Sequence, residues 1–408
     1  MSVSAKWQDT WFLGSLRNRT KVYYWALQAE NIVLNFSPSM PMLGNIKDAK
    51  TATANRSSRS VFFDQKSAHL YLSDRTVFAG KVPTWQKGSF TGEVVFNTGM
   101  TGYTESLTDP SYSNQILVFT YPLIGNYGVD IKASESSRIQ VSGVVVSTAE
   151  HNWSHAGSDR SLLGWLKSQN IPLIFDVDTR ALTKHLRTRG TMQGAISDKS
   201  VRASSLKFTP AQPTDFEPKI YNKNYKKTLV LVDCGAKENI VRELAKLPVR
   251  IKRVPSSYDF TTESYDGVMY SNGPGDPTDY QPTITVAKKA LKLGKPVFGI
   301  CLGSQIMGLA AGATTYKLLF GHRGHNQPCM ETKTKRCFVT SQNHGYALEE
   351  KSLPKDWQVS FRNLNDNSVE GIEHKSKPFF SVQFHPEACP GPTDTAWLFA
   401  KLAKALKV

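Results

Sequence analysis

The sequence has few cysteines, and none lie at a spacing typical of a zinc site or a disulfide framework. There are five in 408 residues, an odd number, and no two form a Cys-x-x-Cys pair. Neither disulfides nor a metal site is therefore predicted, and a reducing compartment, the cytoplasm first, suits this pattern. The five are Cys234, Cys301, Cys329, Cys337 and Cys389.

The chain also lacks a long apolar run, a phosphate-binding loop and a nucleic-acid motif. No stretch approaches the roughly 18 uninterrupted apolar residues of a membrane span. No glycine-rich loop is followed by Lys-Ser or Lys-Thr, so nucleotide binding is expected outside this chain. Acidic residues are the minority, 34 Asp and Glu against 50 Lys and Arg. The basic residues are scattered, however, and indicate no nucleic-acid surface.

The composition is that of an ordinary globular protein, 40% hydrophobic and 21% charged, with room for two or three domains. Residues 1–59 differ from the rest because they hold few acids and end in a Ser/Thr/Ala-rich stretch. We expect this extension to be poorly ordered. Import into an organelle stays open, although no basic segment followed by an apolar core and a cleavage site is present.

Residues 60–206 alternate short β-like runs with two helical patterns, which indicates a smaller mixed α/β domain. Residues 207–227 are rich in proline, polar and basic side chains, and are predicted to link two domains. The expected strands of the first domain are 67–72, 76–79, 93–97, 116–120, 141–146 and 172–177, and the helices are 161–167 and 179–187.

Residues 228–408 alternate apolar runs with amphipathic patterns, which is typical of a doubly wound, mostly parallel sheet. Functional residues are then expected in the loops at the carboxyl ends of the strands. The expected strands are 228–232, 251–254, 267–270 and 297–300, and the expected helices are 237–247 and 283–293.

The strongest chemical signal is Gly-Ile-Cys-Leu-Gly at residues 299–303, between an apolar strand and a helical stretch. This is the layout of a nucleophile elbow, in which a sharp turn pushes the central side chain above the sheet. The amides that begin the helix would stabilise negative charge on the Cys301 sulfur. Taken alone, Cys301 would more readily be one more small buried residue, and His385 a satisfied core histidine.

A histidine and a carboxylate downstream supply the partners that such a sulfur needs. His385 and Glu387 are two residues apart in an extended segment, so their side chains point to the same side. An imidazole can take the thiol proton and return it to a leaving amine, while the carboxylate orients the ring. We therefore predict Cys301, His385 and Glu387 to form a catalytic triad.

A Gly- and Pro-rich loop, residues 271–277, follows the expected strand 267–270. Such a turn exposes backbone N–H groups without side-chain obstruction, and one could point at an oxyanion. The amide of Leu302, the first residue of the helix after the nucleophile, would be the second donor. An ordinary tight turn is the alternative for the loop.

These segments together resemble the class I (triad) glutamine amidotransferases, which hydrolyse the side-chain amide of glutamine and pass ammonia to a partner site. The segments that carry this resemblance are 271–277, 299–303, 342–346 and 385–387. Upstream segments are similar to the first domain of the small, glutamine-hydrolysing subunit of carbamoyl phosphate synthetase. They are 92–98, 101–112, 121–128, 178–183 and 190–192, so the likeness covers about residue 61 to the C-terminus.

The resemblance implies a role for each matching residue. Cys301 would form a glutamyl thioester, His385 would act as base and acid, Glu387 would orient it, and Gly273 and Leu302 would supply the oxyanion donors. Ser304 departs from the family pattern, where His or Asn is common, and His344 is expected to be structural. The implied glutamine pocket is Ser111, Gly273, Gly275, Leu302, Gln305, Asn343, Gly345 and Tyr346.

The same resemblance implies a protein partner, a large synthetase subunit or fused synthetase domains, that binds ATP and Mg²⁺ and uses bicarbonate. No cofactor is expected in this chain, and the first domain would be the docking surface. Another class I amidotransferase, a γ-glutamyl hydrolase, a fragment of a fused pyrimidine-pathway protein and a non-catalytic docking module are the alternatives. Whether the product feeds arginine or pyrimidine synthesis is left open.

Overall fold

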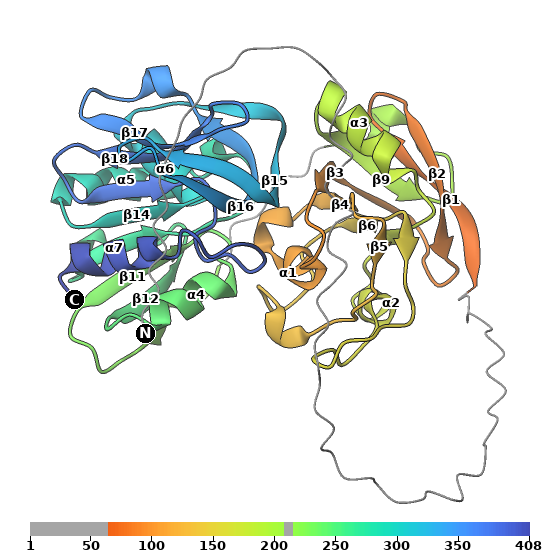
Figure 1. Cartoon of the computed structure of the whole chain (residues 1–408), viewed down its shortest axis with the longest axis horizontal. Coiled ribbons are helices and arrows are strands. Elements are labelled where there is room, and N and C mark those ends of the chain that lie inside the picture. The colour runs from red at the N-terminus through yellow and green to blue at the C-terminus, as the bar shows by residue number, and fades with distance from the viewer. Residues whose placement is uncertain (1–63, 208–214) are drawn as a thin grey trace, which may run out of the picture. The chain divides into compact units, whose positions relative to one another are not determined.

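The fold is built on two β-sheets, one on each side of the segment 207–227, and the computed structural model describes residues 64–207 and 215–408 (Figure 1). The predicted extension, residues 1–59, lies outside the described residues. The first sheet is mixed and has seven strands. In spatial order they are β2 (Val77–Pro83), β1 (Gln65–Leu72), β9 (Met192–Ser197), β3 (Ser89–Asn97), β4 (Gln115–Phe119), β6 (Gly143–Val145) and β8 (Leu173–Ile174).

Helices cover both faces of this first sheet, because alternate strand residues point to opposite sides. Leu182 and Leu186 of one helix pack with Val94 and Phe96 on one face. Two other helices pack on the opposite face, around Val95 and Leu117. The helices are α3 (Thr179–Arg189) on the first face and α1 (Tyr103–Thr108) and α2 (Leu162–Ser168) on the second. The short pair β5 (Leu123–Ile124) and β7 (Thr148–Ala149) stands apart.

The second sheet has ten strands, and its middle is parallel as predicted. The parallel strands, in spatial order, are β12 (Arg250–Pro255), β11 (Thr228–Asp233), β13 (Gly267–Tyr270), β14 (Val297–Ile300) and β19 (Phe379–Val382). The sheet continues beyond β19 with antiparallel strands that the sequence pattern did not reveal. They are β18 (Val369–His374), β17 (Trp357–Asn363), β15 (Thr315–Glu331) and β16 (Cys337–Leu348).

The second sheet is wound on both faces, in agreement with the predicted class. In β11, Leu229 and Leu231 point to the face that α4 (Glu238–Ala245) and α7 (Trp397–Leu406) cover. The alternate residues, Val230 and Val232, point to the face that α5 (Gln281–Leu293) and α6 (Leu302–Ala311) cover. The short 3-10 helices are η1 (Pro110–Tyr112), η2 (Ile131–Ala133), η3 (Ala203–Ser205), η4 (Phe260–Thr262), η5 (Pro277–Asp279) and η6 (Glu350–Ser352).

The segment predicted as a linker is not wholly irregular, since its end contributes a strand to the second sheet. β10 (Lys219–Tyr221) pairs antiparallel with the edge strand β12. The proline content of this segment hid a three-residue strand, because edge strands tolerate nearby prolines. Within the described residues, no helix has both the length and the apolar character needed to cross a bilayer.

Candidate active site

Cys301 stands on a strained turn between β14 and α6. Its backbone is in a left-handed region, with φ 54° and ψ −107°, which non-glycine residues rarely adopt. Its N–H donates a 2.9 Å hydrogen bond to the carbonyl of Val382, which holds the turn against β19. The side chain is 2% exposed. The strained residue of the elbow is therefore the cysteine itself.

The two flanking glycines serve a different purpose, which is to leave room for neighbouring backbone. A Cβ on Gly303 would lie 2.1 Å from the carbonyl oxygen of Tyr270 in β13. A Cβ on Gly299 would lie 2.5 Å from the carbonyl oxygen of Gly303. The elbow therefore needs its two glycines, as predicted, but the reason is the close packing of α6 on the sheet.

Replacing Gly303 by alanine is expected to lower the free energy of unfolding by roughly 3 kcal/mol or more, because α6 must move off β13. Denaturant unfolding of the variant measures this. Gly157→Ala is the matched control, since the nearest atom to its added Cβ lies 3.3 Å away on the flexible His155 side chain. Equal stability of the two variants would contradict the packing argument.

His385 and Glu387 follow β19 and face each other, as their spacing predicted. The imidazole Nδ1 and the carboxylate Oε1 are 2.6 Å apart, and the two residues are only 2% and 3% exposed. The N–H of His385 donates to the carbonyl of Ser341 at 2.9 Å, which holds the segment against β16. The Nε2 atom of His385 has no hydrogen-bond partner among the described residues, so it is available to Cys301 or a substrate.

Burial and charge act in opposite directions on the pKa of this pair. Burial lowers the pKa of His385, but the charges of Glu387 and Cys301 outweigh it and raise the pKa to about 10. Burial raises the pKa of Glu387, but Lys237 and His385 outweigh burial and lower the pKa to about 2. His385 thus holds a proton at neutral pH, and Glu387 is ionised.

The depressed pKa of Glu387 has a consequence for acid stability. The folded-state pKa of about 2 lies below the ordinary value of 4.5, so the carboxylate stabilises the fold above pH 4.5. That contribution is lost as the pH falls through 2. We expect the difference in unfolding free energy between the natural chain and Glu387→Gln to shrink over this interval. Urea unfolding at several pH values measures it, and a pH-independent difference would contradict the ionised pair.

Lys237 is the member of this cluster that sequence reasoning missed. It caps the start of α4, is 3% exposed, and its Nζ lies 3.1 Å from Glu387 Oε1 and 2.5 Å from the carbonyl of Ala388. Burial lowers the pKa of Lys237, but Glu387, Glu135 and Asp109 raise it above the ordinary value. A buried ammonium therefore neutralises the carboxylate that orients His385. The available signal was a lysine in the loop after β11, the first parallel strand of the second sheet, where loops are functional.

The cavity above Cys301 brings together every residue predicted for glutamine. Besides Cys301, the predicted residues that line it are Ser111, Gly273, Gly275, Leu302, Gln305, Asn343, Gly345 and Tyr346. His385 lines a smaller polar cavity instead, and Asn343 borders both. Cys301 thus borders one cavity and the imidazole borders a neighbouring one, with Asn343 shared between them.

The two predicted oxyanion donors are free to act. Among the described residues, no acceptor pairs with the backbone N–H of Gly273 or of Leu302. A Cβ on Gly273 would lie 2.2 Å from the carbonyl oxygen of Cys234, so only glycine lets this loop approach so closely. The side chain of Gln305, a residue of α6, is held in place because its Nε2 donates a 2.8 Å hydrogen bond to the carbonyl of Tyr346.

Residues of both sheets build the site. Asn272, in the loop after β13, donates to Ser111 Oγ at 2.9 Å. Asn343 of β16 donates to Asp109 Oδ2 at 2.9 Å. Ser111 and Asp109 lie in and beside η1, in the first half of the chain. Asp109 was not predicted, although it lies in the segment 101–112 that carried the resemblance.

Four charged residues on the cavity wall were also missed. Lys317 pairs with Glu93 at 2.7 Å between Nζ and Oε1, across the two halves of the chain. Burial raises the pKa of Glu93, but Arg323 and Lys317 outweigh this and lower it. Arg323 is 5% exposed, and its Nε atom has no partner within the described residues. Asp276, in the predicted loop, is the fourth.

Two residues singled out in the sequence, Ser304 and His344, have their polar side-chain atoms in contact with neighbouring residues. Ser304 does not border the cavity, and its hydroxyl lies 2.8 Å from the hydroxyl of Ser381 on β19. His344 borders the cavity, but its ring nitrogens contact the carbonyl of Tyr346 at 2.9 Å and Gln342 Oε1 at 3.3 Å. These partners agree with a structural place for His344.

Comparison with known families covers both halves of the chain. Residues 70–196 match the family described as carbamoyl-phosphate synthase small chain, CPSase domain. Residues 230–405 match glutamine amidotransferase class-I. The order of the two domains is the order that the sequence resemblance implied.

Several curated proteins are similar over most of the chain. The multifunctional protein CAD of Squalus acanthias is 47% identical over 81% of this chain and 16% of its own length. The multifunctional protein URA2 of Saccharomyces cerevisiae is 43% identical over 83% of this chain and 17% of its own length. Carbamoyl-phosphate synthase [ammonia], mitochondrial, of Rattus norvegicus is 42% identical over 84% of this chain and 24% of its own length.

This chain therefore spans between about a sixth and a quarter of the length of these relatives. The match nevertheless includes both β-sheets and the loops that carry the site. The chain therefore contains, in order, a carbamoyl-phosphate synthase small-chain domain and a class I glutamine amidotransferase domain.

Proposed function

We propose that this chain hydrolyses L-glutamine to glutamate and ammonia, as the glutamine-hydrolysing part of a carbamoyl-phosphate synthase. The observation that carries the proposal is the position of Cys301. Its sulfur is held on a strained elbow between the cavity and the buried pair of His385 and Glu387. A strained nucleophile beside an oriented imidazole is the arrangement that acyl transfer requires.

In the first step, the proton of the Cys301 thiol already resides on His385, and the sulfur anion attacks the side-chain carbonyl carbon of glutamine. A C–S bond forms, and the carbonyl oxygen gains the negative charge that the N–H groups of Gly273 and Leu302 stabilise. The oxyanion then collapses, the C–N bond breaks, and His385 returns its proton to the departing nitrogen. Ammonia leaves, and a glutamyl thioester stays on Cys301.

In the second step, water restores the enzyme. His385 takes a proton from the water as its oxygen attacks the thioester carbonyl carbon. The C–S bond breaks and glutamate leaves, and His385 keeps the proton beside the released sulfur anion, which restores the starting state. Glu387, ionised and held by Lys237, keeps the imidazole in one orientation through both steps.

The cavity walls offer partners for the charged end of the amino acid. Glutamine carries an α-ammonium and an α-carboxylate, so it needs groups of both charges or backbone amides and carbonyls. Arg323 and Lys317 provide positive charge, and Glu93 and Asp276 provide negative charge. Gly345 and Tyr346 offer backbone groups, while Ser111 and Gln305 contribute small polar groups.

We further propose that the ammonia passes to synthetase domains on a large subunit or on a longer form of this chain. Those domains would bind ATP and Mg²⁺ and use bicarbonate, and the first domain would dock them. The curated relatives support either arrangement, because they include multifunctional proteins and a carbamoyl-phosphate synthase. A cytoplasmic location is proposed, and the name of the rat relative, a mitochondrial carbamoyl-phosphate synthase, keeps mitochondria as the alternative.

An electrophilic glutamine analogue, diazo-oxonorleucine, tests the hydrolytic proposal. We expect one adduct per chain on Cys301, found by peptide mass spectrometry, and protection by excess glutamine. The exposed Cys337 serves as an internal control that should stay unlabelled. Labelling of Cys337 with no label on Cys301 would overturn the proposal.

Comparing turnover with and without the synthetase partner tests the partnership. The isolated chain is expected to hydrolyse glutamine slowly and to accelerate on docking. Equal rates in both states would remove the coupling but leave the hydrolytic proposal intact.

A further inference from the structure

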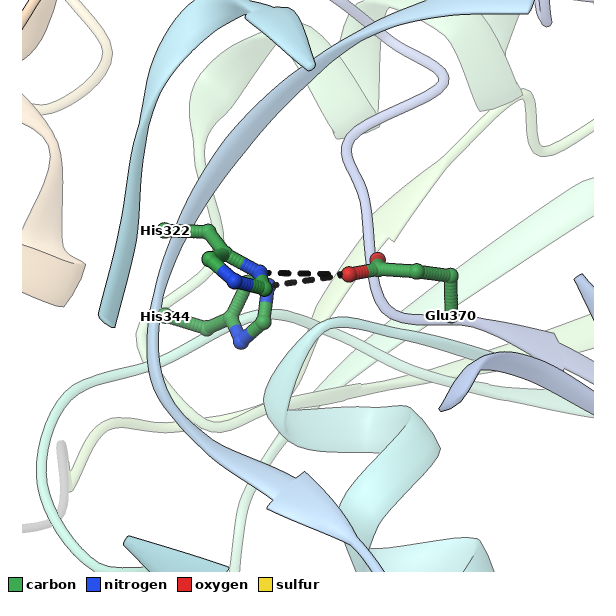
Figure 2. Close-up of side chains that lie close together, drawn as sticks. All are labelled: His322, His344 and Glu370. Carbon is green, nitrogen blue, oxygen red and sulfur yellow. Dashed lines mark ion pairs between the residues drawn. The ribbon is translucent and has the colours of Figure 1, made fainter. Parts of the chain in front are cut away.

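A second cluster of chemically active side chains lies in the antiparallel part of the large sheet. His322 of β15 and His344 of β16 face each other as a directly paired cross-strand couple, and Glu370 of β18 points at both rings (Figure 2). All three are buried, with exposed fractions of 8%, 5% and 0%. The proposed glutamine chemistry uses none of them as a reacting group.

The spacing of the three side chains is that of metal ligands. Glu370 Oε1 lies 3.3 Å from His322 Nδ1 and 3.6 Å from His344 Nε2. Two nitrogen or oxygen ligands of a tetrahedral zinc ion, each about 2.1 Å from the metal, are about 3.4 Å apart. All three ligand atoms lie within 4.8 Å of one another. Small side-chain adjustments would therefore suffice to close the site.

Each histidine is also held through its other ring nitrogen, as metal-binding histidines usually are. His322 Nε2 lies 2.9 Å from the carboxylate of Asp366. His344 Nδ1 lies 2.9 Å from the carbonyl oxygen of Tyr346, which can accept only from a protonated nitrogen. In this arrangement His344 Nε2 presents a lone pair to Glu370, and His322 Nδ1 lies on the same side.

An independent observation is an unsatisfied oxygen. Glu370 Oε2 is buried and has no hydrogen-bond partner within the described residues. Besides the two imidazoles, its other oxygen, Oε1, receives only long hydrogen bonds, 3.3 Å from Asn363 and 3.4 Å from Ser368. A buried carboxylate that is left this poorly bonded is costly unless a cation completes its shell.

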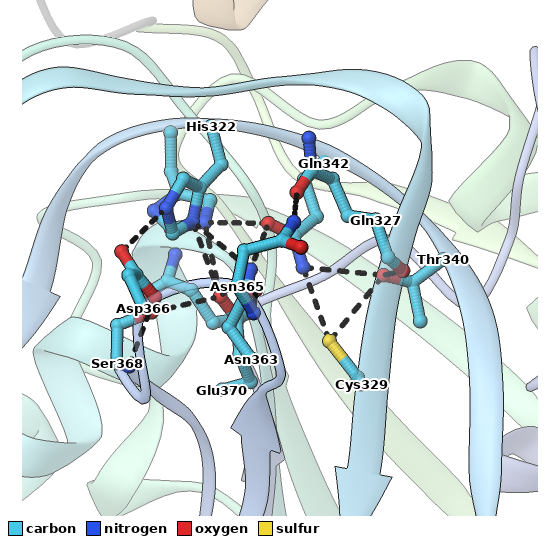
Figure 3. Close-up of polar contacts among 12 residues, drawn as sticks. His322, Gln327, Cys329, Thr340, Gln342, Asn363, Asn365, Asp366, Ser368 and Glu370 are labelled. Carbon is cyan, nitrogen blue, oxygen red and sulfur yellow. Dashed lines mark hydrogen bonds and ion pairs between the residues drawn. The ribbon is translucent and has the colours of Figure 1, made fainter. Parts of the chain in front are cut away.

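Polar groups around the cluster could supply the fourth ligand of a tetrahedral metal ion. Figure 3 shows a network of amides, carboxylates and hydroxyls from β15 to β18 around the cluster. Gln342 Oε1 lies 3.3 Å from His344 Nε2, so it or a water molecule could be the fourth ligand. An ion pair between a charged His322 and Glu370 is the competing arrangement. It satisfies Oε1 but leaves Oε2 without a partner.

We propose that His322, His344 and Glu370 bind a divalent transition-metal ion, zinc in the first place, that fastens β15, β16 and β18 together. Two imidazoles and one carboxylate are a donor set that suits zinc and excludes calcium and magnesium, which prefer oxygen ligands. The bound ion would stiffen the strand that carries Asn343, Gly345 and Tyr346. The proposal requires no particular reaction at Cys301.

The experiment uses the full chain, stripped with a chelator and titrated with zinc chloride, with bound metal measured by elemental mass spectrometry. We expect about one zinc per chain and a higher melting temperature with zinc. Cys301→Ala should bind equally well, which separates this site from binding by Cys301 and His385. Cobalt should replace zinc and give the visible absorption of a four-coordinate nitrogen and oxygen site.

Four variants localise the ion. Glu370→Gln and His322→Gln should weaken zinc binding by more than about 100-fold, and Asp366→Asn by about 10-fold. Asp366 is 40% exposed at its side chain, so this variant should fold even if the buried ones do not. His155→Gln changes an exposed histidine and should bind like the natural chain. A natural chain that takes up no zinc, or uptake that Asp366→Asn and Glu370→Gln leave unchanged, would overturn the proposal.

Discussion

Replacing Cys301 by alanine is expected to abolish glutamine hydrolysis, with a loss of about 10⁴-fold or more in kcat. No other described side chain can replace the sulfur, because Cys301 alone combines the strained elbow, the cavity and the neighbouring imidazole. A coupled assay that monitors glutamate release measures the loss in kcat. The alanine removes one atom from a well-packed position, so the fold should persist.

Assembly with a synthetase partner sharpens this experiment. The complex that contains Cys301→Ala should lose glutamine-dependent carbamoyl phosphate formation but retain formation from free ammonia. Cys337→Ala is the matched control, because Cys337 is exposed and should behave like the natural chain. Unchanged glutamine-dependent synthesis in the Cys301→Ala complex would favour a non-catalytic docking module instead.

Replacing Lys237 by methionine is expected to lower the free energy of unfolding by about 3–5 kcal/mol, because Glu387 then stays buried without its cation. Glutamine hydrolysis should fall as well, since the pKa of Glu387 would rise and its hold on His385 would weaken. Denaturant unfolding and glutamate release measure the two effects. Methionine keeps most of the side-chain volume, so the change is mainly one of charge.

The double variant Lys237→Met with Glu387→Gln separates stability from activity. It removes both members of the Lys237–Glu387 ion pair, so it should regain much of the lost stability while staying poorly active. Lys246→Met is the matched control, because Lys246 pairs with Glu243 on the surface and its side chain is 67% exposed. That control should change stability by less than about 1 kcal/mol. Similar losses for Lys237→Met and Lys246→Met would contradict the buried ion pair.

Local pattern was enough to predict the elbow, the parallel strands and the pairing of His385 with Glu387. Each of these depends on residues that are neighbours in sequence. Strand β14 and helix α6 flank Cys301 directly, and a spacing of two places both triad partners on one side of an extended segment. The expected strands 267–270 and 297–300 coincide with β13 and β14 for the same reason.

The antiparallel strands β15–β18 escaped prediction because their side chains face partners on both sides. Buried polar residues such as His322, Asn363 and Glu370 interrupt the apolar alternation that marks a strand. His322 and Glu370, together with His344, form the cluster proposed to bind metal. A scan for cysteine-based metal motifs could not find it, since its ligands come from three strands and include no cysteine.

The sequence by itself determined the fold class and was enough to predict the nucleophile and its two partners, because short-range periodicity and turn chemistry encode them. Only the tertiary structure decided what surrounds them. Lys237 meets Glu387 across 150 positions, and Asp109 meets Asn343 across 234. Contacts between residues so far apart arise from the packing of whole elements. No local pattern specifies which charge will lie beside which.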